Sequence, residues 1–234
     1  MTMPIFRHIP ERHVHRQRLG RHIEHDPQSR AFALEPDALA QPVTKVWARH
    51  GAIFDQGDLG SCTGNAMAGV INTDPFFLPG RVLTEDNAVA IYEAATRLDR
   101  VPGSYPPNDT GSSGLAAAKA AKRMGLIPSY KHAFSLHGTL MALGQGPVIA
   151  GINWYDSFDQ PSGMGALVEI SADATVRGGH EIEILEVHVD ARLVRIANSW
   201  SDQWGDHGYF TMGWSTLERL LSEGGDVTVP LPHA

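Results

Sequence analysis

Residues 54–67 read Phe-Asp-Gln-Gly-Asp-Leu-Gly-Ser-Cys-Thr-Gly-Asn-Ala-Met and hold the single cysteine, Cys62, of this 234-residue chain. A glycine-rich loop ends at Cys62 and a run of small and apolar residues follows, which predicts a helix from Cys62 to Asn72. Unpaired N–H groups and the dipole at the start of a helix favour a thiolate over a thiol. Because an isolated cysteine is more often buried and inert, its role depends on what else the chain carries.

Two later segments carry the groups that a nucleophilic cysteine needs. Residues 178–180 read Gly-Gly-His, and residues 196–210 read Ile-Ala-Asn-Ser-Trp-Ser-Asp-Gln-Trp-Gly-Asp-His-Gly-Tyr-Phe. Acyl transfer through a thioester requires a thiolate, a proton carrier and a group that holds the imidazole in one tautomer. A lone His or a lone Asn-Ser-Trp is ordinarily structural, so the ordered combination is what indicates a catalytic site.

Together these segments resemble the papain-like cysteine peptidases. In that family a Gln precedes the catalytic Cys by six residues, as Gln56 does here, and the block from Asn198 to Phe210 is matched as well. The resemblance spans about residues 46–214. It implies an α+β, two-lobed fold in which a helical lobe and an antiparallel sheet or barrel-like lobe enclose the active-site cleft.

The resemblance also implies a role for each matched residue. Cys62 is expected to be the nucleophile and His180 its partner in a thiolate–imidazolium pair, while Asn198 orients His180. Gln56 is expected to supply one oxyanion-hole donor, with the backbone N–H of Cys62 as the second. Trp200 is expected to cover the hydrogen bond between Asn198 and His180.

Two further residues are predicted to bind substrate. Gly111, in an Asp-Thr-Gly stretch, is our candidate for the backbone that pairs with an extended substrate. Glu181 stands where the family usually has a small residue, on the wall of the pocket for the second residue on the acyl side of the cleaved bond, and it could select a basic side chain there. Strand alternation places Glu181 and Glu183 on one face opposite His180, and two acids on one face are more often solvated, so both interpretations stay open.

The chain divides into a leader and a domain. Residues 1–43 are predicted to form a basic His- and Arg-rich arm, and residues 44–234 the peptidase domain, with a helical lobe over about 54–133 and a β lobe over about 134–234. Helical spacing comes first and short β-branched segments follow, which is typical of an α+β protein. The predicted helices after the first are 88–98, one through 115–124 capped by Ser112 or Ser113, and one after Ser135; the predicted strands are 147–153, 166–170, 181–189, 193–197 and 208–212.

The arm differs in charge from the rest of the chain. Residues 1–30 hold six Arg against three acidic residues, although the net charge of the whole chain is −7. Its pairs His13 with His15 and His22 with His25 invite a metal site, but no completing ligand is evident, so a solvated basic arm is favoured. An Arg-rich segment also suits an acidic groove, and we therefore hypothesise that it lies across the cleft and that deleting residues 2–43 raises activity.

Composition excludes several classes of protein. The chain is 42% hydrophobic and 19% charged, which is typical of a globular domain. Its acidity disfavours nucleic acid as a partner, and no apolar run suggests a membrane span or signal peptide. One cysteine cannot form an intrachain disulfide, and Leu59 stands where secreted relatives have a second cysteine. We therefore expect a cytoplasmic protein of a bacterial or viral branch, with association with a virus particle as the alternative location.

The sequence thus predicts a cysteine-type endopeptidase that acts on peptide or protein substrates and needs no metal or organic cofactor. Two alternatives remain. An amidase or transferase, for example one acting on peptidoglycan peptides, would use the same cysteine chemistry. A non-catalytic scaffold or binding protein would retain the fold without needing Cys62.

Overall fold

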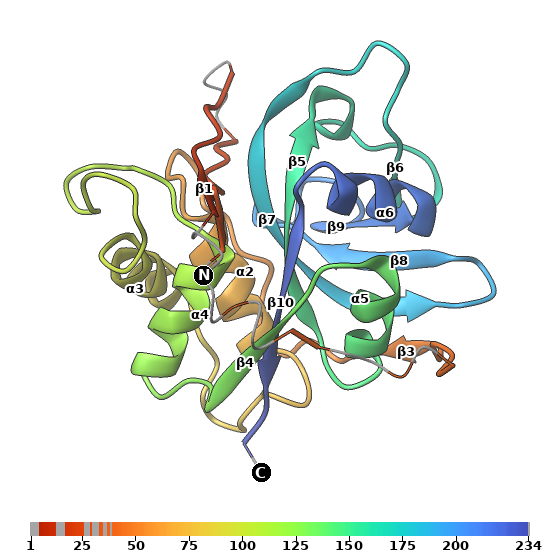
Figure 1. The fold of residues 1–234 in the computed structure, drawn as a ribbon, viewed down its shortest axis with the longest axis horizontal. Coiled ribbons are helices and arrows are strands. Elements are labelled where there is room, and N and C mark those ends of the chain that lie inside the picture. Colours follow the sequence, from red (N-terminus) through yellow and green to blue (C-terminus); the bar gives the residue numbers. More distant parts are fainter. Residues whose placement is uncertain are drawn as a thin grey trace.

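The computed structural model describes residues 5–12, 17–25, 29, 33–34, 37 and 39–233. Three helices, α2 (Cys62–Ile71), α3 (Glu85–Thr96) and α4 (Gly114–Arg123), pack against one another on one side of the molecule, and a sheet lies beside them (Figure 1). The two-lobed α+β arrangement predicted from the sequence is therefore confirmed.

The helix boundaries follow local signals. The Ser113 hydroxyl caps α4 by accepting a hydrogen bond from the Ala116 N–H at 3.1 Å. Gly125, in the left-handed region at φ +69°, comes two residues after the helix ends. Ser135 caps the shorter helix α5 (Leu136–Leu143) in the same way. These are the helices that the sequence predicted, and their ends agree with it to within a few residues.

The main sheet runs in the order β4-β10-β5-β7-β8-β9-β6, with β3 paired to β7, within the described part of the chain. Its neighbouring strands are antiparallel except for β6 and β9. Strands β4 and β10 and helix α6 were not predicted from the sequence. The bounds are β3 (Lys45–Val46), β4 (Ser129–Ala133), β5 (Val148–Tyr155), β6 (Leu167–Val168), β7 (Val176–His188), β8 (Leu193–Ala197), β9 (Tyr209–Gly213), α6 (Trp214–Ser222) and β10 (Asp226–Leu231).

Each lobe has its own hydrophobic core. The helical core is made chiefly by α2, α3 and α4, whose small side chains let the helices approach closely. The core of the sheet lobe contains Trp154 and Phe210 and also Leu19, which belongs to the N-terminal arm. Among the described residues no helix has the length and apolar character needed to cross a membrane.

The N-terminal arm is not solvated along its described length. Strand β1 (Ile5–Arg7) pairs with β2 (Ile23–His25), and this ribbon lies between the two lobes (Figure 1). Leu19 and residues 21–25 are buried. The expectation of a solvated arm is therefore wrong for this segment, because it lies between the lobes and hydrogen bonds to both of them.

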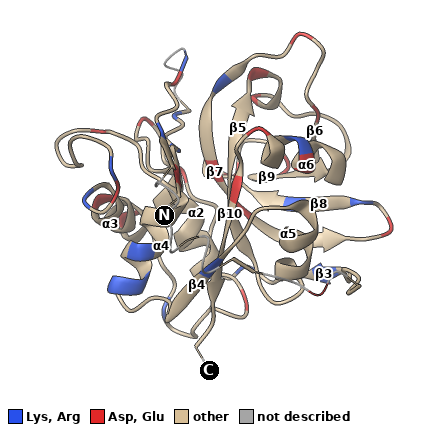
Figure 2. Cartoon of the chain, viewed as in Figure 1, with Lys and Arg blue, Asp and Glu red and all other residues tan. Residues whose placement is uncertain are grey.

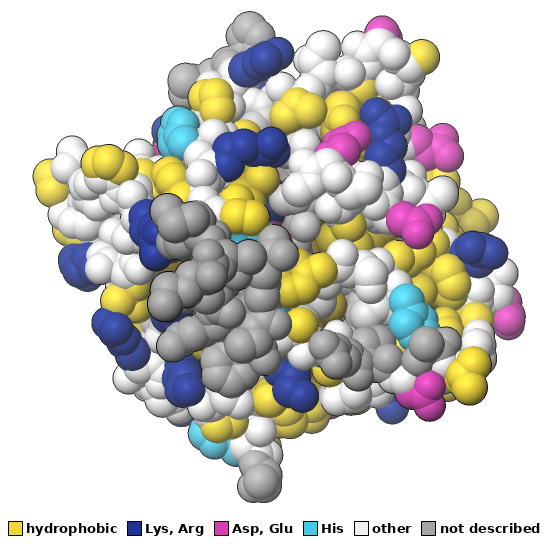
Figure 3. All heavy atoms as spheres, in the orientation of Figure 1, with side chains coloured by type: hydrophobic (Ala, Val, Ile, Leu, Met, Phe, Trp, Pro, Cys, Tyr) yellow, Lys and Arg dark blue, Asp and Glu magenta, His cyan; other side chains and the backbone are white. Residues whose placement is uncertain are grey.

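Acidic and basic side chains are distributed differently on the face of the molecule that Figure 3 shows. Acidic side chains on the face in Figure 3 lie mainly over the sheet lobe, whereas Lys and Arg are spread over both lobes. Among the coloured residues, this face has no continuous basic surface of the kind that phosphate backbones bind.

Candidate active site

Cys62 is the first residue of α2, which packs against β7, and its side chain is fully buried. The backbone N–H groups of Glu181 and Thr63 both act on the sulfur and lower its pKa. Removal from water acts more strongly in the opposite direction, so the pKa of the Cys62 thiol is raised overall. The thiolate expected from the helix start is therefore disfavoured in this closed arrangement, because burial outweighs the local N–H groups.

His180 lies on β7 and is held by Asn198, which follows β8. The His180 Nε2 is 2.7 Å from the Asn198 Oδ1, and that oxygen also accepts the Ser199 backbone N–H at 2.8 Å. Because the Asn198 Oδ1 is an acceptor, the His180 Nε2 must donate to it. Nε2 therefore carries the proton, and the unprotonated Nδ1 can act as a base. The Nδ1 atom is buried without a hydrogen-bond partner among the described residues.

Two tryptophans enclose the imidazole. The Trp200 ring lies tilted over His180 with centroids 5.0 Å apart, and the edge of Trp154 meets His180 at 4.8 Å. Burial lowers the pKa of His180 to about 3, and the hydrogen bond to Asn198 opposes that shift only in part. Trp154 was missed by the sequence analysis, since a Trp at the end of a buried strand is ordinarily a core residue.

No family model and no curated protein sequence matches this chain. Among solved structures, xylellain, a cysteine protease from Xylella fastidiosa, matches with a TM-score of 0.71 at 18% identity, over 96% of this chain and 98% of that one. The chain has the papain-like fold.

Two other solved structures of this fold agree with that assignment. The procathepsin B S9 of Trypanosoma congolense matches with a TM-score of 0.63 at 12% identity, over 94% of this chain and 88% of that one. The procathepsin L 3 of the Tenebrio molitor larval midgut matches with a TM-score of 0.61 at 15% identity, over 94% of this chain and 75% of that one. At these identities the likeness shows the fold alone.

Gln56 is joined to Ser199, the residue that follows Asn198. Its side-chain Nε2 donates to the Leu59 carbonyl at 2.8 Å, and its Oε1 accepts from the Ser199 hydroxyl at 2.6 Å. These two bonds fix the orientation of the amide and leave the second hydrogen on Nε2 without a partner among the described residues. Ser199, like Trp154, carried no signal in the sequence, because its hydroxyl matters only through a partner 143 positions away.

The backbone that pairs with an extended segment is that of Ser112 rather than Gly111. The Ser112 N–H donates to the Gly20 carbonyl at 2.8 Å, and the Ser112 carbonyl accepts the His22 N–H at 2.7 Å. Gly111 instead donates its N–H to the Tyr92 hydroxyl at 2.9 Å. The arm therefore pairs with Ser112, next to the tight turn at Gly111 with φ +69°, and the pairing of Gly111 with an extended substrate stays a prediction.

Glu181 and Glu183 share one face of β7, as alternation predicted, but both are 1% exposed. The expectation that these acids are solvated is wrong, because this face of β7 packs against α2 rather than against water. Burial raises the pKa of both carboxyls. Each of them faces an arginine, Arg21 for Glu181 and Arg49 for Glu183.

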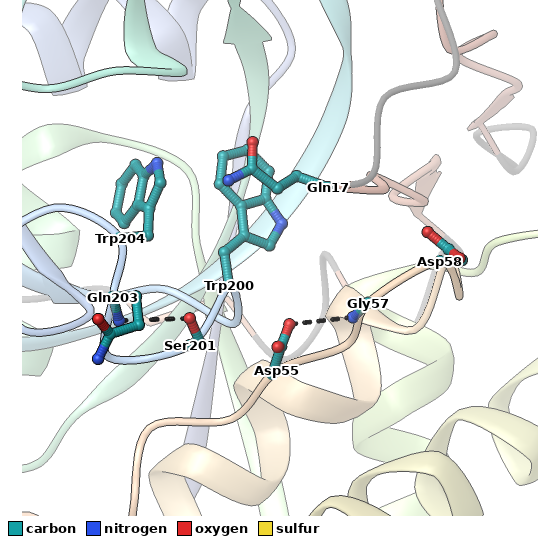
Figure 4. A pocket seen from close by; sticks show the side chains of 8 residues that line it. All are labelled: Gln17, Asp55, Gly57, Asp58, Trp200, Ser201, Gln203 and Trp204. Carbon is teal, nitrogen blue, oxygen red and sulfur yellow. Dashed lines mark hydrogen bonds between the residues drawn. The ribbon is translucent and has the colours of Figure 1, made fainter.

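A cavity of about 640 Å³ opens beside Trp200 (Figure 4). The cavity is adjacent to the candidate catalytic residues through Trp200, whose indole N–H donates to the Arg18 carbonyl of the arm at 3.2 Å. Its lining residues are Gln17, Asp55, Gly57, Asp58, Trp200, Ser201, Gln203 and Trp204.

The arm histidines do not form a metal site within the described residues. No group of three or more His, Cys, Asp or Glu side chains there is placed to hold a metal ion. His22 hydrogen bonds instead to the Thr110 carbonyl at 2.7 Å and to the backbone N–H of Ile9 at 3.2 Å. His13 and His15 lie outside the described residues.

Proposed function

We propose that this chain is a papain-like cysteine endopeptidase that hydrolyses peptide bonds in peptide or protein substrates. The observation that carries the proposal is the orientation of His180, whose Nε2 is engaged by Asn198 while Nδ1 is left unpartnered in the described structure. The position of Cys62 at the start of α2, against the backbone N–H next to His180, supports the same assignment. The fold shared with cysteine proteases is consistent with it.

In this proposal the reaction proceeds in two steps. The Cys62 sulfur attacks the peptide carbonyl after its proton passes to His180 Nδ1, and the oxyanion is stabilised by the Gln56 amide and the Cys62 N–H. The C–N bond breaks as His180 returns that proton to the leaving amine, which leaves a thioester. Water, deprotonated by His180, then cleaves the thioester and restores the thiol with release of the carboxylic acid.

We propose in addition that the arm keeps this site latent. Gly20 and Arg21 donate their backbone N–H groups to the Gly179 carbonyl at 3.1 and 3.0 Å, next to His180, while Gly20 is also bound by Ser112 of the other lobe. This double contact would exclude a substrate from the cleft. The matched procathepsins cover 94% of this chain, a share that has to include part of residues 1–43.

The direction of the arm explains why it would not be cut. Gly20 packs against Gly60, two residues before Cys62, and the next residue, Arg21, lies beside Glu181. With rising residue number the arm therefore runs from the Cys62 side toward Glu181. A substrate whose acyl side occupies the Glu181 pocket would reach Cys62 in the opposite chain direction. The arm would therefore fill the cleft without presenting a peptide bond in the reactive orientation.

The test combines intact mass with peptide hydrolysis in the full-length chain. We expect Gly20→Ala to displace the arm, because a Cβ on Gly20 would lie 2.2 Å from the Gly60 carbonyl oxygen. In Gly20→Ala we expect one molecule of a peptidyl epoxysuccinate to add to Cys62. Adding His180→Ala to that variant should lower the rate of peptide hydrolysis about a million-fold. The peptidase function would be refuted, and a scaffold favoured, if Gly20→Ala hydrolysed no peptide and if Cys62 were labelled equally with His180 and with alanine at that position.

A further inference from the structure

Arg177 is a buried cation near the start of β7, and its side chain is 3% exposed. In the pairing of β5 with β7, Trp154 is opposite Gly178 but Tyr155 is opposite Val176, so Arg177 is an extra residue without an opposite one. An extra residue of this kind bends the strand and redirects its own side chain. Figure 2 shows a basic position at the start of β7, and an ion pair joins it to an acid that follows β5.

Asp159 is the partner of this cation. It follows η1 (Asp156–Phe158), the short 3-10 helix after β5, and its Oδ1 accepts a hydrogen bond from the Arg177 Nη1 at 2.6 Å. The same Oδ1 accepts the Trp154 indole N–H at 2.8 Å, and the Asp159 carbonyl accepts the Trp204 indole N–H at 2.8 Å. Asp159 thus holds two indole rings, and a charge-assisted bond to Arg177 holds Asp159.

A third tryptophan contacts Arg177 directly. The guanidinium carbon of Arg177 is 5.4 Å from the centroid of the Trp200 ring, which is within the range of a cation–π interaction. Trp200 in turn meets Trp154 and Trp204 edge to face, with centroids 4.8 and 5.3 Å apart. Trp154, Trp200 and Trp204 therefore form one tryptophan cluster, and the Arg177–Asp159 pair borders it.

The tryptophan cluster supports the imidazole of His180. Asn198 holds Nε2 at one end of the ring, and Nδ1 has no hydrogen-bond partner among the described residues. The plane of the ring therefore depends on its neighbours Trp154 and Trp200, whose centroids are 4.8 and 5.0 Å away. In the proposed reaction Nδ1 takes the proton of Cys62, and a displacement of about 1 Å can cost such a reaction about 100-fold in rate.

The arm uses a different part of Arg177. The Nη2 of Arg177 donates to the Gln17 carbonyl and lies 3.5 Å from the Glu11 Oε1, and the Arg177 carbonyl accepts the Arg12 N–H at 2.6 Å. The bond to Asp159 and the contact with the tryptophan cluster, in contrast, lie within the sheet lobe. The second set of contacts therefore does not depend on the arm.

We propose that Arg177 and Asp159 are positioning residues for His180: they fix the tryptophan cluster, and the cluster fixes the plane of the imidazole ring. The inference rests on the proposed peptidase function and adds to it two residues that act through others. Neither residue belongs to a motif identified in the sequence, because their effect depends on an irregularity in β7 and on tryptophans from two separate segments.

The first experiment measures hydrolysis of a fluorogenic peptide amide of aminomethylcoumarin by Gly20→Ala. Arg177→Gln and Asp159→Asn, each added to that form, remove one charge of the pair. We expect kcat to fall about 10- to 100-fold and KM to change less than about threefold, because a tilted imidazole impairs proton transfer rather than substrate binding. Arg177→Lys keeps the cation and should recover kcat to within about fivefold.

Arg195 provides the matched control. This arginine of β8 makes the same kinds of contact at another place in the sheet: an ion pair with Asp206, a hydrogen bond to the Gly165 carbonyl at 2.9 Å, and a cation–π contact with Tyr209 at 5.2 Å. Arg195→Gln should change kcat less than about twofold. Equal falls in kcat for the two Arg→Gln variants, or a change confined to KM, would overturn the proposal.

A second measurement does not depend on catalysis. In the full-length chain the buried His180 Nε2–H should exchange slowly with water, and nuclear magnetic resonance of a sample labelled with ¹⁵N-histidine follows it, with His180→Ala identifying the signal. Arg177→Gln and Asp159→Asn should each accelerate this exchange about tenfold, while Arg177→Lys and Arg195→Gln leave it near the wild-type rate.

The two measurements separate failure of the positioning from failure of the peptidase. If Gly20→Ala cleaves no peptide but the exchange responds as expected, the peptidase function fails and the positioning of His180 stands. If Arg177→Gln does not fold, Asp159→Asn carries both measurements, since the Asp159 side chain is 22% exposed. Exchange at the wild-type rate in the folded variants would overturn the proposal.

Discussion

Glu181 and Glu183 are two buried acids on the same face of β7, and each faces an arginine from a different part of the chain. Glu183 forms an ion pair with Arg49 of its own domain, and the Thr73 hydroxyl donates to its other oxygen at 2.6 Å. Glu181 faces Arg21 of the arm, and its oxygens have no hydrogen-bond partner within the described residues. The first arrangement is an ion pair within one domain, whereas the second depends on a cation that the arm supplies.

The difference teaches that one strand can bury two acids against cations from different parts of the chain. The two carboxyl groups are equally buried, since both are 1% exposed. What separates them is whether the compensating cation belongs to the folded domain or to a segment that crosses the cleft. Removing either cation would leave a buried acid without its compensating charge.

Unfolding experiments should show the largest effect of this difference. Glu183→Gln leaves Arg49, whose side chain is 4% exposed, without its partner and is expected to lower the free energy of unfolding by about 3–5 kcal/mol. Glu181→Gln should change it by less than about 1 kcal/mol, because Arg21 keeps its ion pair with Asp226. Urea unfolding at neutral pH measures both, and equal losses would contradict the comparison.

The pH dependence of Cys62 alkylation should show the next largest effect. With the arm in place, burial raises the pKa of Cys62 and lowers that of His180 to about 3, so both groups are neutral near pH 7. Gly20→Ala should readmit water, and a thiol paired with a protonated histidine has a pKa of about 3–4.

We therefore expect the alkylation rate of wild type to rise steadily from about pH 6 to about pH 9, as the thiol ionises. The rate of Gly20→Ala should be nearly flat and about 10- to 100-fold faster at the acidic end, because the overpacking that displaces the arm costs about 1–3 kcal/mol. Rates are read from intact mass after timed exposure to iodoacetamide. Two parallel profiles would count against the arm as the cause of latency.

Two helix caps provide the smallest and most closely matched test. Ser113→Ala and Ser135→Ala each remove a cap and should each cost about 1 kcal/mol of unfolding free energy. Only the Ser113 hydroxyl also donates to Glu24 of the arm, at 2.8 Å. Ser113→Ala should therefore accelerate Cys62 alkylation about two- to threefold, while Ser135→Ala leaves it unchanged. Equal alkylation rates in the two variants would argue that Glu24 does not hold the arm.

Features carried by contiguous residues could be predicted from the sequence. The helix after Cys62, the capped helix after Ser113 and the strand at 193–197 follow from period, capping and β-branching, and the structure contains all three. The order of Cys62, His180 and Asn198 was enough to predict the fold. Strand β10 was missed because its only marks are a short apolar run and a proline near the chain end.

Properties that depend on register or on a distant segment could not be predicted. Alternation put Glu181 and Glu183 on one face correctly, but whether that face meets water or α2 depends on how the lobes pack. That the arm pairs with Ser112 depends on the single turn at Gly111. The arm's charge suggested an acidic groove, although nothing in its composition distinguished a solvated segment from a buried one.

The sequence by itself determined the papain-like fold and the residues proposed for catalysis, because helix caps, strand period and motif order are written in neighbouring positions. Only the tertiary structure brought Asp226, Gly151 and Glu181 into one row and placed Arg21 between them. The physical reason is that pairing across strands and burial between lobes join residues far apart in the chain. A carboxylate's environment, and with it its role, is decided by those long-range contacts.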